Sequence, residues 1–234
     1  MTITQSIDTS RPRRFDFITG EVTPKWRGRI HAASAAASTI ACGIFGVAAS
    51  GLALIACLIY SFSMVVCFGV SAGYHLRARS HRAQTLMRRL DHAAINLLIA
   101  GTATPLYLLG APAAWGYPML VATWSSALIG VIVKLSGNLS PSSSLWFLLT
   151  GWTALLALPA IWSYSGSTTA LLVLAGGLVY SAGALCFWRK WPTLNPDVFG
   201  YHEFWHACTV VGGSLHLLAV LNLVAQIGSS TAPL

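Results

Sequence analysis

The chain has 234 residues, of which 55% are hydrophobic and only 9% are charged, and its mean hydropathy is +0.66. Soluble domains carry about 25% charged residues, so this composition excludes an ordinary soluble globular protein. The net charge of +8 would suit a nucleic-acid-binding protein, but the placement of the basic residues, described below, argues against nucleic acid as a partner.

The beginning of the chain is polar. Residues 1–24 carry three arginines and lack the apolar segment of a secretory signal peptide. We therefore predict a disordered cytoplasmic N-terminal tail over residues 1–24, followed by one membrane domain over residues 25–234. The five cysteines all lie in apolar stretches, at spacings that suit no metal site. We expect them to be small core residues.

Seven stretches have the composition of membrane spans. A spanning helix needs about 20 mainly apolar residues. The stretches that meet this requirement are, in chain order, 30–49, 52–75, 91–110, 114–135, 144–163, 168–188 and 202–226. Pro105 and Pro159 fall inside spans, where membrane helices tolerate proline. The predicted fold class is therefore all-α, a seven-transmembrane helix bundle.

The fourteen Lys and Arg residues predict the orientation of this bundle. Six precede the first span, five lie between the second and third, Lys134 closes the fourth, and Arg189 and Lys190 follow the sixth. With seven spans all fourteen lie on one side, which the positive-inside rule assigns to the cytoplasm. We therefore predict a cytoplasmic N-terminus and a C-terminus outside, with membrane lipids as the partners of the basic residues.

Three of the predicted spans carry polar residues at their cytoplasmic ends. The second ends in "SAGYH", Ser71 to His75, the third begins near Asp91, and the seventh begins with "HEFWH", His202 to His206. At a rise of about 1.5 Å per residue, these groups share one depth in the membrane. Such polar residues cost free energy in a membrane and generally mark a site. Three neutral imidazoles with one open position are the usual composition of a catalytic zinc site.

Two of the nearby polar residues have more than one interpretation. Asp91 opens a predicted span, where aspartate often caps a helix, and it could also orient a histidine or a water at a metal. Ser71 lies one turn before His75 on the same face, although serines in membrane helices commonly bond to their own backbone. Read alone, His-Glu-Phe-Trp-His matches the metalloprotease pattern, in which the glutamate, here Glu203, is the general base.

The remaining histidines are assigned to simpler roles. His31 and His81 are expected to be interfacial, and His92, which points about 100° around the helix from Asp91, is not expected to be functional. His216 lies about 15 Å deeper than His206 and cannot reach the same metal. Both a core position and a cavity-lining position stay open for it.

Taken together, three motifs resemble the hemolysin III branch of the progestin and adipoQ receptor (PAQR) family. They are Ser-x-x-x-His in the second span, "LDHAAINLLIAGTATP" in the third and "FGYHEFWHACTVVGGSLH" in the seventh, and the resemblance covers essentially the whole chain after residue 24. It implies zinc as the cofactor, with the ligands His75, His202 and His206. It also implies that Asp91 binds zinc through a water and that Ser71 lies beside this aspartate.

The resemblance also bears on Glu203. Adiponectin receptors of the family have glutamine at this position, which implies that the glutamate is not an obligatory base. We therefore expect Glu203 to face the cytoplasmic headgroups or a nearby arginine such as Arg88.

Three functions are compatible with these features. The first is a zinc-dependent hydrolase of a lipid amide or ester at the inner leaflet, with Asp91 and Ser71 as catalytic residues; alkaline ceramidases are similar to the family in site design. The alternative is a non-enzymatic membrane-homeostasis or receptor-like protein with structural zinc. A cytolysin is least favoured, because the predicted chain has no obvious water-soluble form. Structural zinc usually has four protein ligands, whereas three are found here, which favours the hydrolase. The resemblance further implies a multi-pass protein of the bacterial inner membrane.

Overall fold

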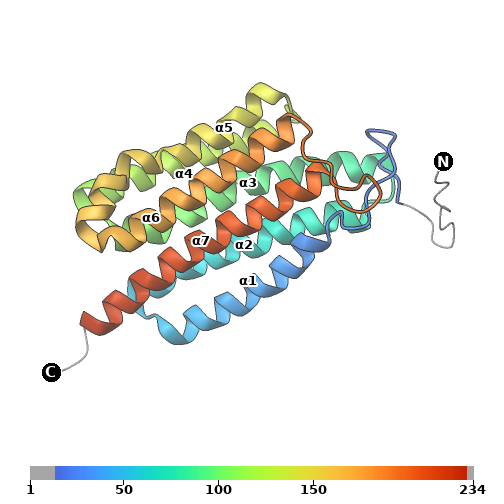
Figure 1. Cartoon of the computed structure of the whole chain (residues 1–234). Coiled ribbons are helices and arrows are strands. Elements are labelled where there is room, and N and C mark those ends of the chain that lie inside the picture. The colour runs from blue at the N-terminus through green and yellow to red at the C-terminus, as the bar shows by residue number, and fades with distance from the viewer. Residues whose placement is uncertain (1–13, 231–234) are drawn as a thin grey trace.

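The computed structural model describes residues 14–230 and consists mainly of long helices (Figure 1). The helices are α1 Arg29–Ala48, α2 Gly51–Arg77, α3 His81–Gly110, α4 Ala113–Leu135, α5 Pro141–Trp152, α6 Ala154–Trp188 and α7 Tyr201–Ser230. Within this described part, extended backbone pairing is limited to the isolated bridges Phe15–Val22 and Asn195–Phe199. The predicted all-α class is confirmed. Residues 1–13 of the predicted tail lie outside the described residues.

Six stretches of the described chain are long and apolar enough to cross a membrane. Five of them are single helices. The remaining one, Leu145–Trp188, runs for 44 residues through α5 and α6. Gly166 interrupts the helical geometry of α6 with φ 84° and ψ 168°, a conformation that glycine adopts at little cost. In Figure 1, α5 and the start of α6 run toward the left end of the bundle, and the rest of α6 returns beside α7. The predicted fifth and sixth spans both lie in this one stretch.

Helix α3 begins earlier than the predicted span. Ser80 caps its first turn, because the Ser80 hydroxyl oxygen accepts a hydrogen bond from the backbone N–H of Ala83 at 3.2 Å. The connection from α2, which ends at Arg77, is therefore only three residues long. As a result, Asp91 lies inside α3 rather than at its start, and the predicted capping role for Asp91 is wrong.

Helices that follow one another in the chain pack together, and α7 ties the two ends of the chain into the bundle. It packs along α6 and also contacts α1, α2 and α3. Small residues allow the α6–α7 approach: a Cβ on Gly212 would lie 2.7 Å from the Tyr180 ring, and one on Gly176 would lie 2.4 Å from the His216 ring. The start of α7 therefore reaches the end of α2 and the start of α1 (Figure 1).

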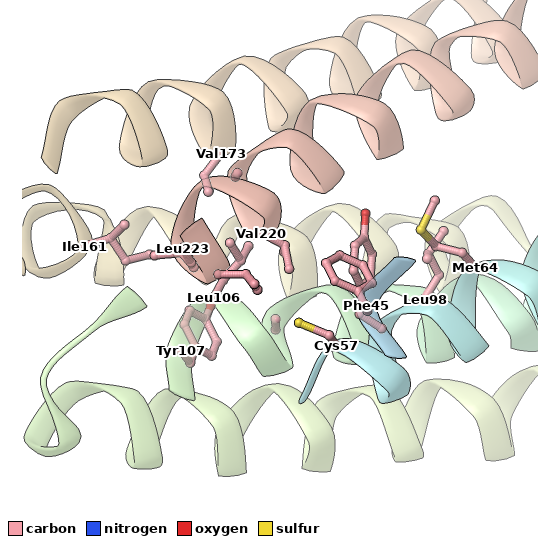
Figure 2. Close-up of a cluster of buried hydrophobic side chains, with 14 of the residues drawn as sticks. Phe45, Cys57, Met64, Leu98, Leu106, Tyr107, Ile161, Val173, Val220 and Leu223 are labelled. Carbon is pink, nitrogen blue, oxygen red and sulfur yellow. The ribbon is translucent and has the colours of Figure 1, made fainter. Parts of the chain in front are cut away.

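The buried core lies among α1, α2, α3, α6 and α7, and Figure 2 shows part of it, including Phe45, Leu106 and Leu223. On the periphery, large apolar side chains stay exposed, for example Val47 at 92% and Leu149 at 66%. Apolar exposure on this scale suits contact with lipid. All five cysteines are free, and two of them, Cys57 and Cys67, are buried as the sequence predicts.

Residues 14–28, named here the inner strap, cross the end of the bundle where α7 begins. The backbone N–H of Phe17 donates to the side-chain oxygen of Gln84 on α3, at 2.7 Å. The backbone N–H groups of Lys25 and Trp26 donate to carbonyl oxygens of the loop before α7, at 3.0 and 3.2 Å. The inner strap differs from the predicted disordered tail because these bonds fix its backbone.

Candidate metal centre

Three histidines from two helices converge at the inner-strap end of the bundle. His75 lies in the last turn of α2, and His202 and His206 lie in the first two turns of α7. Each offers one ring nitrogen, and these nitrogens all lie within 4.8 Å of one another. The ring centroids are 4.7 to 5.0 Å apart. The structure therefore brings together the three residues that the sequence predicts as metal ligands.

The chemistry of this group fits a metal ion. In the described structure, Nε2 of His75 is buried and has no hydrogen-bond partner. Buried polar atoms without a partner are rare and costly, and a metal ion bound to this lone pair would remove the cost. Imidazole nitrogens are preferred ligands of Zn²⁺. The donor set and the unpartnered nitrogen agree on a site for such an ion.

The spacing of His202 and His206 depends on how α7 begins. Gly200 precedes the helix, and its backbone N–H donates to Oε2 of Glu203, three residues later, at 2.8 Å. This is the reciprocal half of a capping box, in which a glutamate in the first turn satisfies a free N–H group at the helix start. Because α7 is regular from Tyr201 onward, the two histidines lie one turn apart on one face.

Glu203 is engaged by protein groups on both of its carboxylate oxygens. While Oε2 accepts from Gly200, Oε1 forms an ion pair with Nε of Arg27 in the inner strap. The Glu203 side chain is 0% exposed, and that of Arg27 is 13% exposed. The prediction that Glu203 faces the headgroups or Arg88 is wrong: its partner is Arg27, and its carboxylate is fully buried. A carboxylate held in this way is poorly placed to act as the base of a metalloprotease.

Asp91 and Ser71 form a second polar pair at the α2–α3 contact. Ser71 is buried one turn before His75, and its side chain neighbours that of Asp91 on α3. Asp91 itself lies outside the group whose ligand atoms are within 4.8 Å of one another. The described structure thus brings Ser71 to Asp91, but it does not make Asp91 a direct member of the histidine group.

His31 is a neighbour of the site that the sequence analysis assigns elsewhere. It lies in the first turn of α1, is only 5% exposed and stacks on His206, with ring centroids 3.9 Å apart and planes 2° apart. The expectation that His31 is interfacial is therefore wrong. A usable signal exists in the sequence, because His31 begins the first span at the same predicted depth as His75 and His202.

Two further histidines bond elsewhere. Nδ1 of His92 lies 2.9 Å from the carbonyl oxygen of Arg88, one turn earlier in α3. Nε2 of His216 lies 3.1 Å from the carbonyl oxygen of Val173 and so links α7 to α6. His216, which is half-buried, therefore contributes to the α6–α7 contact.

The inner strap lies directly on the last turn of α2. Gly28 has a φ of 78°, and a Cβ at this position would lie 2.7 Å from Cβ of His75 and 3.1 Å from Cγ of Leu76. Both the backbone conformation and the close approach require glycine here. Because Arg27 pairs with Glu203 and Gly28 touches His75, the strap contacts both helices that carry the histidines.

Comparison with known proteins gives a consistent result. The family model described as "Haemolysin-III related" matches residues 20–217. The chain is 31% identical over 180 residues to "Hemolysin-3" of Bacillus cereus, which covers 76% of this chain and 78% of that protein. It is 30% identical over 167 residues to "Hemolysin-3 homolog" of Bacillus subtilis (strain 168), covering 70% and 74% of the two chains.

Proposed function

Because the chain belongs to the haemolysin-III related family, the hemolysin III branch of the progestin and adipoQ receptor family, we propose that it is a zinc-dependent hydrolase of a lipid amide or ester. Family membership and six membrane-capable stretches make it a multi-pass protein of the bacterial cell membrane. The reaction and the metal are the proposed part.

The observation that carries the proposal is the three-histidine group. His75, His202 and His206 supply three nitrogens, which is one fewer than a structural zinc site usually has. The missing fourth ligand leaves a position for a water or a substrate carbonyl. When bound, zinc would activate a water at neutral pH and polarise a carbonyl.

The protein groups around the histidines suit this chemistry. We assign Asp91 the role of accepting a proton from the attacking water, because it neighbours Ser71, one turn before His75, and is not one of the three grouped ligands. The Ser71 hydroxyl, a neighbour of that carboxylate, would hold it in one orientation. We do not assign the base role to Glu203, because its two carboxylate oxygens already bind Arg27 and Gly200.

The proposed topology places this site at the inner leaflet. At about 1.5 Å per residue, the stretch Leu145–Trp188 of 44 residues is about twice as long as one span requires. We propose that Gly166 divides it into two spans, which gives seven. Seven spans put the two termini on opposite sides of the membrane. This agrees with Figure 1, in which α7 ends at one end of the bundle and the inner strap lies at the other. The basic residues then orient the strap toward the cytoplasm.

The test uses purified full-length protein in lipid nanodiscs, with and without stoichiometric zinc. Product release from long-chain N-acyl amides and acyl esters is followed by mass spectrometry. The wild type should hydrolyse one class only when zinc is present. The variant Asp91→Asn should lose turnover while it keeps most of the zinc, and Glu203→Gln should keep turnover within about tenfold.

Other outcomes favour other functions. If Glu203→Gln is inactive and Asp91→Asn is active, the metalloprotease arrangement applies instead. If zinc-loaded wild type hydrolyses no substrate in either class, and removal of zinc only lowers the unfolding temperature, zinc is structural and the hydrolase proposal fails.

A further inference from the structure

His31 connects three helices at the metal centre. Its ring stacks on that of His206 of α7, with a centroid distance of 3.9 Å and an interplanar angle of 2°. Its ring centroid lies 5.0 Å from that of Phe68 of α2, which is 2% exposed. The His31 ring is therefore packed against a rigid core aromatic as well as against a candidate ligand.

A hydrogen bond fixes the ring of His31 in its plane. Nε2 of His31 lies 2.9 Å from the hydroxyl oxygen of Thr209. That hydroxyl donates its only proton to the carbonyl oxygen of His206, at 2.8 Å. The Thr209 oxygen must therefore accept a hydrogen bond from Nε2–H of His31. Stacking and hydrogen bonding together leave the ring little freedom to rotate or tilt.

The tautomer that follows suits a position beside a cation. With the proton on Nε2, Nδ1 of His31 carries a lone pair and no proton, and this atom is buried without a hydrogen-bond partner. The ring is then neutral. It therefore adds no positive charge beside the three histidines, and it presents a flat apolar face to His206.

We propose that His31 is a positioning residue for the metal centre. It acts by holding the His206 ring in its ligand orientation. Among the imidazoles around His206, those of His75 and His202 lie farther away, at 5.0 and 4.7 Å, and they are tilted by 50° and 67°. Among the described residues, only His31 covers a face of the His206 ring in a parallel stack. This inference rests on the proposed function to the extent that His206 binds a metal.

The test measures the metal itself rather than turnover. Full-length protein is purified in detergent and loaded with Co²⁺, whose visible absorption bands report coordination geometry. Release to a chelator gives the dissociation rate. His31→Ala should release Co²⁺ about 10- to 100-fold faster than the wild type, the usual effect of losing a residue that orients a ligand. Its absorption bands should broaden, because His206 gains alternative orientations.

Two variants separate positioning from general damage. His31→Phe keeps a flat ring against His206 but cannot bind a metal, and it should return the release rate to within about threefold of the wild type. His216→Ala removes another histidine of α7, at the α6 contact, and should release Co²⁺ within about twofold of the wild type. Both changes in the Co²⁺ release rate are small compared with the increase that His31→Ala should cause.

Several results would overturn the inference. A wild-type spectrum and release rate in His31→Ala would show that the stack does not matter, while the metal site itself would stand. Equal losses in His31→Phe and His31→Ala, with His216→Ala normal, would make His31 a ligand. A wild type that takes up no Co²⁺ or Zn²⁺ would refute the metal site and this inference together.

Discussion

The buried ion pair between Arg27 and Glu203 allows a prediction about stability that also tests the role of the glutamate. The two ends of the pair differ in environment: the side chain of Glu203 is 0% exposed, whereas that of Arg27 is 13% exposed. Removing Arg27 therefore leaves a fully buried carboxylate without a counter-charge. Removing the charge of Glu203 leaves an arginine that can turn toward water. We expect the first change to be the more harmful.

The expected magnitudes follow from these environments. Breaking a buried pair by removal of one partner costs about 3–5 kcal/mol, and this range applies to Arg27→Met. In Glu203→Gln, the amide oxygen can still accept the hydrogen bond from Gly200, and only the charged bond is lost, at about 1–2 kcal/mol. The double variant removes both charges, so it should be more stable than Arg27→Met alone, by about 1–2 kcal/mol.

The assay is reversible unfolding in mixed micelles of increasing SDS content, monitored by fluorescence of the nine tryptophans. The free energy of unfolding is compared among the wild type, the two single variants and the double variant. Arg29 is an exposed arginine two residues after Arg27. The variant Arg29→Met is therefore the matched control and should change the free energy of unfolding by less than about 0.5 kcal/mol.

Two results would contradict this reasoning. If Glu203→Gln is as unstable as Arg27→Met, the difference in burial does not determine the cost. If the losses of the single variants simply add in the double variant, the two residues are not energetically coupled.

Four further predictions concern the candidate metal, the strap and the topology of the chain. The protein should bind one zinc per chain by elemental analysis, and His202→Ala should reduce this sharply because two nitrogens make a weak site; full zinc content in that variant would refute the ligand assignment. Zinc should be released as the pH falls to about 5, since imidazole binds metal only in its neutral form, and pH-independent zinc content would argue against histidine ligands. Gly28→Ala should lower the unfolding temperature, because its Cβ would lie 2.7 Å from Cβ of His75; an unchanged temperature would mean that the strap moves freely. Reporter fusions should place the two termini on opposite sides of the membrane, and the same side for both would refute seven spans.

The sequence predicts much of this arrangement because two of its signals act locally. Hydropathy locates α1, α2, α4 and α7 to within a few residues, and helical spacing puts His202 and His206 on one face of α7. Predicted depth then adds His75 from α2. The start of α3 is missed because an arginine-rich stretch lowers the hydropathy without preventing helix formation once Ser80 provides a cap.

The contacts of the first helix could not be predicted in the same way. Hydropathy shows that α1 is long and apolar enough to cross a membrane, but it does not show which helices are its neighbours. The partners of Arg27 and His31 lie on α7, 176 and 178 residues away in the chain. For this reason Glu203 is expected beside headgroups, although it is buried against Arg27, and His31 is expected at the interface, although it stacks on His206.

The separation between Arg27 and Glu203 also has a consequence for biosynthesis. The ribosome makes the inner strap first and α7 last, 176 residues later, and domains fold as their segments emerge. While the intervening helices insert, Arg27 lacks its native partner Glu203, and His75 has neither of the two α7 histidines beside it. Completion of the histidine group must therefore await insertion of the last helix. Any metal that the group binds must therefore be loaded after α7 is made, and a nascent chain arrested before α7 would lack both the Arg27–Glu203 pair and the complete histidine group.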